Sequence, residues 1–294
     1  MSVRAAYIAV IVVWATTPLG IKLSSAGVSI YDAALLRMLL AVAFGVLLLV
    51  ALRVPFAWAA GWRSYVAGAF SLYGGLLPVY FAAQSIPSGL ISVLWGLSPV
   101  VASLMAVRWL GERALSPGKL LALLAALGGL ALVFRGELTP GASSAEGLIA
   151  CLLSVLLFTY GAMHVKRLDA GVHPLAQTVG SLVLALPLFQ LTWLAKDGSF
   201  PQSLSPGALL ALVYLGVFAS VLSYVPYFYI LQKLPMARVA LTTLVSPVIA
   251  LFLGLALAGE ELPPSALIGS VVILLALLAY HMEERFRPRA SAAQ

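Results

Sequence analysis

Charged residues are scarce in this chain of 294 residues, and their scarcity excludes a water-soluble protein. Asp, Glu, Lys and Arg make up only 9% of the sequence, whereas hydrophobic residues make up 62%. A typical soluble domain contains about 25% charged residues, and a fold of this size needs much more polar surface to dissolve in water. The composition therefore predicts an integral membrane protein in contact with the lipid bilayer.

Cysteine and histidine are also rare, which removes several kinds of site. The one cysteine, Cys151, lies in an apolar run, so neither a disulfide framework nor a metal site can be built on it. The sequence shows no metal-ligand spacing, no Ser-His-Asp arrangement and no glycine-rich phosphate loop. We therefore expect no catalytic residues, no metal, no cofactor and no enzymatic activity.

Acidic residues are fewer than basic ones, and the formal net charge is +7. A basic balance can indicate nucleic-acid binding, but this chain has no polar scaffold to carry a basic patch. The basic residues instead lie in short segments between apolar runs, where Lys and Arg determine the orientation of a membrane protein. We expect no nucleic-acid partner.

Long apolar runs are what the chain has in abundance. Because a membrane-crossing helix needs about 20 residues, the sequence predicts an all-α integral membrane protein with ten transmembrane helices. The run from Tyr65 to Val107 is uncharged and too long for one span, so we expect a turn at residues 85–89. The predicted spans cover residues 5–22, 31–52, 65–84, 88–108, 117–134, 146–165, 174–194, 206–231, 236–258 and 264–281.

The distribution of Lys and Arg predicts the orientation. With the N-terminus inside, 13 of the 17 basic residues fall in cytoplasmic segments and Arg37 falls within a span. Only Lys22, Arg135 and Lys196 fall outside. Cytoplasmic loops are enriched in Lys and Arg, so we expect a multi-pass protein of the inner (plasma) membrane with both termini in the cytoplasm.

Eight residues of the first half recur 148 positions later, which predicts an internal repeat. Because each unit has five helices, an odd number, the second unit must be inverted. The predicted units are a first five-helix repeat at 1–135, a linker at 136–145, a second repeat at 146–282 and a cytoplasmic tail at 283–294. The matching pairs are Pro78/Pro226, Gln84/Gln232, Pro87/Pro235, Ser98/Ser246, Pro99/Pro247, Val100/Val248, Gly111/Gly259 and Glu112/Glu260.

Arg37 is the one charged residue deep inside a predicted span. An intramembrane charge is costly and usually faces a cavity or a partner. A guanidinium matches a substrate carboxylate in a bidentate geometry. The alternative is a purely structural network with Asp32 and Lys22.

Polar and aromatic residues form stripes on two central helices. In lipid such side chains turn toward protein or a water-filled cavity, so we expect the stripes to line a pocket for a small amphipathic molecule. Helix–helix hydrogen bonding or an interfacial aromatic belt is the alternative. The stripes are Tyr73, Tyr80 and Gln84 in the third span, and Ser220, Tyr224 and Tyr227 in the eighth.

The remaining candidates lie on four other spans. Trp14 shares a face of the first span with Pro18. Tyr160 and His164 are four residues apart, and His164 could titrate near neutral pH or simply pack. The Ser-Pro pairs of the fourth and ninth spans favour a role as bend points over a role in substrate contact. These last two spans contribute the candidates Trp95, Ser98, Thr243 and Ser246.

Together these motifs resemble the EamA-type transporters of the drug/metabolite transporter superfamily. Each half has Pro at the turn between its third and fourth helices, Ser-Pro-Val in its fourth helix and Gly-Glu at that helix's end. Trp14 and the Leu36-Arg37 segment also resemble the family's repeat signature, and the resemblance covers about residues 5–282. The second repeat departs from it, since Phe158 stands in place of Trp14 and Ser181 or a neighbour in place of Arg37.

The resemblance implies an exporter or exchanger whose helices 1–4 and 6–9 surround a central cavity. Relatives transport amino acids, other small metabolites or, in eukaryotes, nucleotide sugars and sugar phosphates. We therefore expect a secondary active transporter that exports a small molecule such as an amino acid by alternating access. A membrane-embedded enzyme for lipid-linked substrates, a channel and an exporter of drugs are the alternatives, and a homodimer is left open.

Overall fold

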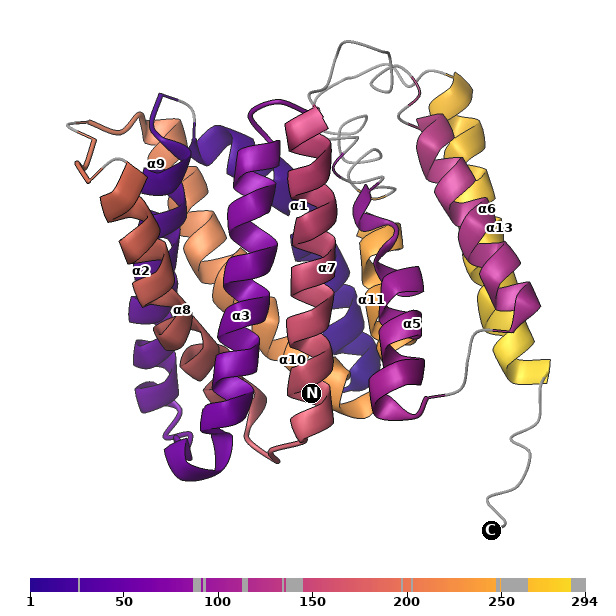
Figure 1. Cartoon of the computed structure of the whole chain (residues 1–294), viewed down its shortest axis with the longest axis horizontal. Helices are drawn as coiled ribbons and strands as arrows, with labels where there is room; N and C mark the ends of the chain where they lie inside the picture. The colour runs from indigo at the N-terminus through magenta and orange to yellow at the C-terminus, as the bar shows by residue number, and fades with distance from the viewer. Residues whose placement is uncertain are drawn as a thin grey trace.

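The computed structural model describes residues 1–25, 27–86, 91, 94–112, 116–133, 135, 145–196, 198–201, 203–246, 249 and 264–286. Within these ranges every regular element is a helix (Figure 1). The first half contains α1 (Val3–Ser24), α2 (Ile30–Ala51), α3 (Trp58–Ala82), α5 (Ser98–Leu110) and α6 (Pro117–Val133). The second half contains α7 (Ala145–Leu168), α8 (Pro174–Lys196), α9 (Pro206–Tyr214), the π-helix η2 (Leu215–Leu222), α10 (Tyr224–Lys233), α11 (Met236–Ala240) and α13 (Pro264–Phe286).

The helices have the length and composition of membrane spans. Five described segments are long and apolar enough to cross a bilayer: α2, α3, α7, α8 and the continuous stretch Pro206–Lys233. Five shorter apolar helices complete the described set, so a multi-pass membrane protein is supported while the number of spans is not fixed at ten. Large side chains such as Leu47 and Leu210 point outward, 65% and 71% exposed, as lipid-facing residues do.

Local sequence signals set several helix ends. Ser2, Ser29 and Ser205 precede α1, α2 and α9, and each side chain accepts a hydrogen bond from a backbone N–H in the first turn. At the other end of α5, Gly111 adopts a φ of 65°, a left-handed conformation that glycine takes without steric cost. The predicted separation between the spans at 206–231 and 236–258 is confirmed, since α10 ends at Lys233, α11 begins at Met236 and Pro235 lies between them.

The helix that carries the third predicted span is longer than the span itself. α3 begins at Trp58, seven residues before the predicted start at residue 65, and includes Arg63 in its second turn. The Arg63 guanidinium lies 5.4 Å from the ring centroid of Trp62. Apolar length alone missed this turn because a helix can continue past the hydrocarbon region among aromatic and basic residues.

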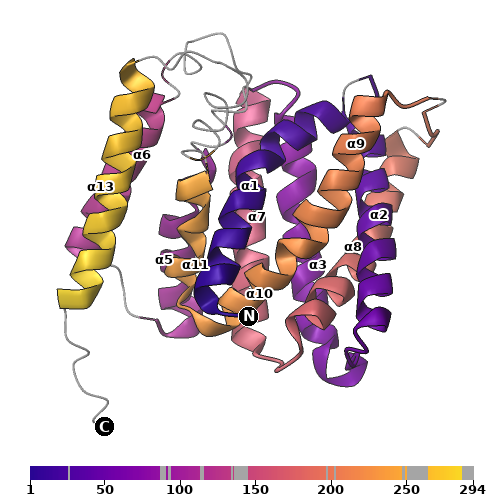
Figure 2. The same cartoon turned by 180° about the vertical axis from the view of Figure 1, so that it is seen from behind.

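The major helix pairs join the first half of the chain to the second. α3 packs on α7 and α8, α2 on α8 and η2, and α1 on α9 and α10. α5 packs on α11, while α6 and α13 pair at one side of the molecule (Figure 1). α1 starts at the edge of the molecule where α7 ends, so these two helices run in opposite directions (Figure 2). The core therefore forms between the halves and not within either one.

Small residues allow the closest of these contacts, between α3 and α7. A Cβ added to Gly161 would lie 2.6 Å from the backbone nitrogen of Ser71. The Ser71 hydroxyl donates to the Phe158 carbonyl at 2.7 Å, and the Ser154 hydroxyl donates to the Gly75 carbonyl at 2.5 Å. Small side chains and serine-to-backbone bonds are the usual means by which helices associate in lipid.

Candidate functional site

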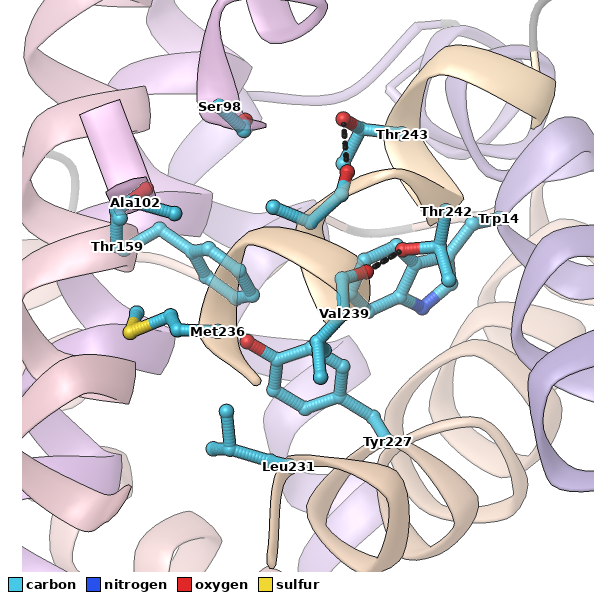
Figure 3. A pocket seen from close by; sticks show the side chains of 12 residues that line it. Trp14, Ser98, Ala102, Thr159, Tyr227, Leu231, Met236, Val239, Thr242 and Thr243 are labelled. Carbon is cyan, nitrogen blue, oxygen red and sulfur yellow. Dashed lines mark hydrogen bonds between the residues drawn. The ribbon is translucent and has the colours of Figure 1, made fainter. Parts of the chain in front are cut away.

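A small cavity lies where α1, α5, α7, α10, α11 and the residues directly after α11 meet (Figure 3). Its volume is about 20 Å³, which accommodates about one water molecule. None of the described residues that line it is charged. The lining consists of Trp14, Ser98, Ala102, Phe158, Thr159, Tyr227, Leu231, Met236, Val239, Ala240, Thr242 and Thr243.

Trp14 is the centre of an aromatic wall of this cavity. Its ring centroid lies 5.1 Å from that of Tyr227 and 5.9 Å from those of Phe158 and Tyr224. Trp95 packs against Phe158 at 5.2 Å. Aromatic rings offer apolar contact area and faces that attract cations. The wall can therefore hold an apolar group or a small cationic group such as an ammonium.

A hydrogen bond between the halves holds Trp14 in place. The indole Nε1 donates to the Ser223 hydroxyl at 3.1 Å, and that hydroxyl donates to the Ala219 carbonyl at 2.8 Å. Ser223 lies at the junction between η2 and α10. The ring that dominates the cavity is thus attached to the opposite half of the chain.

Three of the hydroxyl groups that line the cavity already donate their protons within the protein. Ser98 donates to the Trp95 carbonyl at 2.7 Å. Thr242 and Thr243 donate to the carbonyls three residues earlier at 2.9 and 2.8 Å (Figure 3). A hydroxyl that donates its proton keeps lone pairs as acceptors. These side chains therefore suit a ligand that brings N–H or O–H donors.

The structure brings part of the predicted site to this cavity. Trp95 and Tyr224 contact its aromatic wall without lining it, and the Ser246 hydroxyl donates to the carbonyls of Thr242 and Ile11. The proposed matched bend cannot be described, because Pro247 lies outside the described residues. The predicted residues that line the cavity are Trp14, Ser98, Tyr227 and Thr243.

Sequence reasoning missed the other eight lining residues, among them Phe158, Thr159 and Thr242. A signal existed for Phe158, since it stands 144 residues after Trp14 at the corresponding place in the second half. The two rings contact each other across the halves. A repeat counterpart of a site residue is therefore itself a candidate when the halves meet face to face.

Arg37 forms a second cluster beside the cavity. Its side chain is only 1% exposed, and its Nε donates to the Ser220 hydroxyl at 2.9 Å. Ser220 lies in the π-helix η2, which packs on α2. The predicted stripe Ser220, Tyr224 and Tyr227 is buried along its length, but it divides between Arg37 and the cavity.

The close approach of η2 to α2 depends on a glycine. A Cβ on Gly216 would lie 2.7 Å from the Cβ of Leu40 and 3.3 Å from the Arg37 carbonyl oxygen. Short π-helical turns occur frequently at functional sites because they rotate side chains out of α-helical register. Here the π-turn places Ser220 opposite the buried guanidinium.

The stripe on α3 does not reach the cavity. Tyr73 forms a 2.6 Å hydrogen bond with Thr192 of α8 and packs on Phe189. Tyr80 is buried with no hydrogen-bond partner for its hydroxyl among the described residues, and Gln84 is exposed. None of these predicted binding residues contributes to the cavity lining.

Tyr160 and His164 lie together on another face of α7. Their ring centroids are 4.2 Å apart, and Tyr160 also contacts Phe70 and Trp109. Tyr160 is 39% exposed and neither side chain lines the cavity. The structure thus places this pair outside the group formed by Trp14 and its neighbours.

If the chain is the transporter that its sequence predicts, replacing His164 by Ala should leave uptake and its pH dependence unchanged. Among the described residues, the hydrogen bond of the imidazole is local, between Nδ1 and the Tyr160 carbonyl at 3.0 Å. Uptake into proteoliposomes over about pH 5–8 would measure this. A flattened pH profile in the variant would contradict the expectation and would show that His164 takes part in proton coupling.

A second, larger chamber, here called the vestibule, opens beside the cavity. Its volume is about 390 Å³. Charged residues from the ends of α5 and α7 and the following loop line it, among them Glu112, Lys166, Arg167 and Asp169. Leu231 lines both the vestibule and the cavity. The end of α10 therefore separates the two spaces.

Two charged side chains hold this partition in place. Both carboxylate oxygens of Glu112 accept from the backbone nitrogen of Met236, the first residue of α11, at 3.2 Å. The Lys166 ammonium donates to the carbonyls of Leu231 and Leu234 at 3.0 and 2.8 Å. An anion at a helix N-terminus and a cation at a C-terminus both oppose the local backbone partial charge. The α10–α11 turn is thus stabilised on both sides.

The sequence profile of the EamA-like transporter family matches this chain twice, over residues 4–135 and 145–280. The chain belongs to the EamA-like transporter family. The match covers the helices of both halves, including those that form the cavity and the vestibule. The resemblance drawn from the paired Pro, Ser-Pro-Val and Gly-Glu motifs is therefore confirmed.

Individual relatives are distant but cover most of the chain. It is 28% identical to protein PecM of Dickeya dadantii over 254 residues, 84% of this chain and 81% of that protein. It is 33% identical to an uncharacterised protein of Pseudomonas aeruginosa over 223 residues, covering 74% and 73%. An uncharacterised transporter of Archaeoglobus fulgidus is 25% identical over 65% of this chain and 67% of its own. A solved crystal structure superposes on 97% of this chain and 98% of its own with a TM-score of 0.78, at 18% identity, a likeness of fold alone.

Proposed function

We propose that this protein is a secondary active transporter that exports small metabolites such as amino acids by alternating access. The observation that carries the proposal is the cavity around Trp14. It lies between the two halves of this EamA-like chain and is lined by aromatic rings and hydroxyls. Its volume of about 20 Å³ is too small for a metabolite. A transport cycle would therefore open it from one side at a time.

The vestibule supports this mechanism. It would admit substrate from the cytoplasm if the N-terminus of α1 faces that side, as the distribution of Lys and Arg favours. The turn between α10 and α11 would then be the inner barrier. It would open when the hydrogen bonds of Glu112 and Lys166 to the backbone of this turn break. Two five-helix units rocking against each other around a central site is how inverted-repeat transporters work.

Amphipathic cationic drugs are a second class of substrate that one observation favours. The aromatic wall around Trp14 carries no positive charge, and ring faces attract a desolvated cation by about 2 kcal/mol. A drug exporter and an amino-acid exporter would share the same cavity. They differ in whether the substrate needs a carboxylate.

Counterflow in proteoliposomes tests the proposed function. Vesicles with purified protein would be loaded with one unlabelled amino acid at a time, and uptake of the labelled form would be followed. Saturable counterflow is expected for at least one class of amino acid. Trp14→Ala should reduce it at least about tenfold, because it removes the ring that contacts Phe158, Tyr224 and Tyr227.

Matched variants make this result specific. Trp14→Phe keeps an aromatic ring but loses the bond to Ser223, so an intermediate rate is expected. Trp62→Ala removes an indole that is 45% exposed at the start of α3, and its rate should equal that of the parent protein. Equal loss in the Trp14 and Trp62 variants, or no counterflow of any amino acid by folded protein, would contradict the proposal.

A further inference from the structure

Arg37 is buried in α2 with part of its hydrogen-bonding capacity unused. The side chain is 1% exposed, and its Nη1 has no hydrogen-bond partner in the part of the chain that the structure describes. Its Nε donates to Ser220. A buried donor left unpaired costs about 1–3 kcal/mol, and more when the group is charged. The described residues therefore leave one donor of this buried guanidinium without an acceptor.

The nearby acidic residue does not explain this guanidinium. Asp32 lies five residues earlier on α2, about 7.5 Å along the helix axis, and its Oδ1 accepts from the Trp193 indole at 2.7 Å. Arg37 forms no salt bridge with any described residue. An Arg in a span that has no counter-ion among the described residues is a functional-site candidate, and an anion is the partner that its charge favours.

Tyr224 connects Arg37 to the cavity. Ser220, which accepts the bond from Arg37 Nε, lies four residues before Tyr224 in the continuous segment that runs from η2 into α10. The Tyr224 ring contacts Trp14 at 5.9 Å and Tyr227 at 5.8 Å, and both of those residues line the cavity. The cation and the aromatic wall are therefore adjacent parts of one region between α1, α2 and α10.

The π-helix gives this region a means of change. Ser220 holds Nε from within η2, and η2 continues through Ser223 into α10. Ser223 in turn accepts the Trp14 indole bond. A shift of the π-turn would therefore move the partner of Arg37 and the partner of Trp14 together.

We propose that Nη1 of Arg37 binds the carboxylate of the substrate while Ser220 orients the guanidinium through Nε. The substrate class that follows is a monocarboxylate with an apolar or aromatic body, such as a neutral amino acid. Its body, and an ammonium where present, would lie against the Trp14 wall and the hydroxyl acceptors of Ser98 and Thr243. This inference rests on the proposed transport function. One guanidinium balances the charge of one carboxylate, whereas a phosphate dianion would keep a buried negative charge uncompensated.

Pairs of ligands that differ only in the carboxylate test this proposal. The probes are L-phenylalanine with phenethylamine and L-leucine with isoamylamine. Binding would be measured on purified protein as the ligand-dependent rise in melting temperature, since a ligand that binds only the native state raises it. We expect the two amino acids to bind and the two amines to bind at least about 100-fold more weakly, because the site would leave a buried donor unpaired.

Variants of Arg37 and Ser220 identify the group that binds the carboxylate. Arg37→Gln should lower amino-acid affinity about 100-fold, and Arg37→Lys should restore part of it because the charge remains. Ser220→Ala should cost about tenfold, because the guanidinium loses its orientation. In each variant the small affinity for the amines should stay unchanged.

The outcomes separate this inference from the proposed function. Wild-type protein that binds acid and amine equally, or an Arg37→Gln variant that binds the acid like the wild type, overturns the carboxylate site. If Arg37 is only structural, Arg37→Gln lowers the ligand-free melting temperature and weakens both members of each pair equally. If counterflow is absent but binding still depends on Arg37 and still selects for the carboxylate, the proposed transport function is refuted and the carboxylate site is not. Absence of both would overturn both proposals.

Discussion

Replacing Gly161 by Ala should lower the stability of this protein by about 3 kcal/mol. The added methyl carbon would lie 2.6 Å from the Ser71 backbone nitrogen and 2.7 Å from its Cα, whereas carbon atoms pack at about 3.5–4.0 Å. The obstacle is backbone, so no side chain can rotate away. Separating α3 from α7 would break the bond from Ser71 to Phe158. Thermal unfolding in detergent should show a midpoint lower by roughly 10 °C.

A second glycine provides the control. Gly128 lies in α6, and a Cβ there would meet nothing within 4 Å. Gly128→Ala should leave the midpoint unchanged or raise it slightly, because alanine is favoured over glycine in a helix by about 0.5–1 kcal/mol. Similar midpoints for the two variants would show that α3 and α7 do not pack as closely as the structure has them.

Replacing Glu112 by Ala should open the cavity toward the vestibule. The carboxylate holds the first backbone nitrogen of α11 through both oxygens. Losing such a charged cap costs up to about 2 kcal/mol, which is about a 30-fold shift in an equilibrium between closed and open forms. We expect the rate at which a cysteine reagent modifies Ala240→Cys, a cavity position, to rise by about that factor. Glu112→Gln keeps one acceptor and should give a smaller rise of about fivefold.

The chain suits this labelling experiment because Cys151 is its one cysteine. The experiment would use a Cys151→Ala background, which removes a buried thiol. Glu146→Gln changes an exposed carboxylate in the first turn of α7, far from the vestibule, and should not alter the rate. Unchanged modification of Ala240→Cys in both Glu112 variants would refute the barrier role of the α10–α11 turn.

Much of the fold follows from sequence patterns because each pattern has a local cause. Apolar length located α2, α6 and α8 to within two residues at each end. Pro235 marked the break between α10 and α11. The π-helix η2 left no such trace, and the residues of α2 that Gly216 approaches, Arg37 and Leu40, lie more than 170 positions earlier in the chain.

The candidate site was predictable in part, and the successes share one feature. Trp14, Ser98, Tyr227 and Thr243 are polar or aromatic residues on the central helices, and all four line the cavity. Tyr73, Tyr160, His164 and Gln84 have the same chemistry but other surroundings. A helical stripe shows which residues share a face, yet it does not show which neighbour that face meets.

The sequence by itself determined the membrane environment, the family and most helix ends. The membrane environment and the helix ends depend on composition and on residues close together in the chain, and the family was indicated by motifs that recur 148 positions apart. Only the tertiary structure decided that Phe158 would meet Trp14, that Glu112 would cap α11, and that Ser220 would face Arg37. Each of these contacts joins helices more than 100 residues apart, because the core forms between the halves. Their geometry depends on close helix packing that no local pattern encodes.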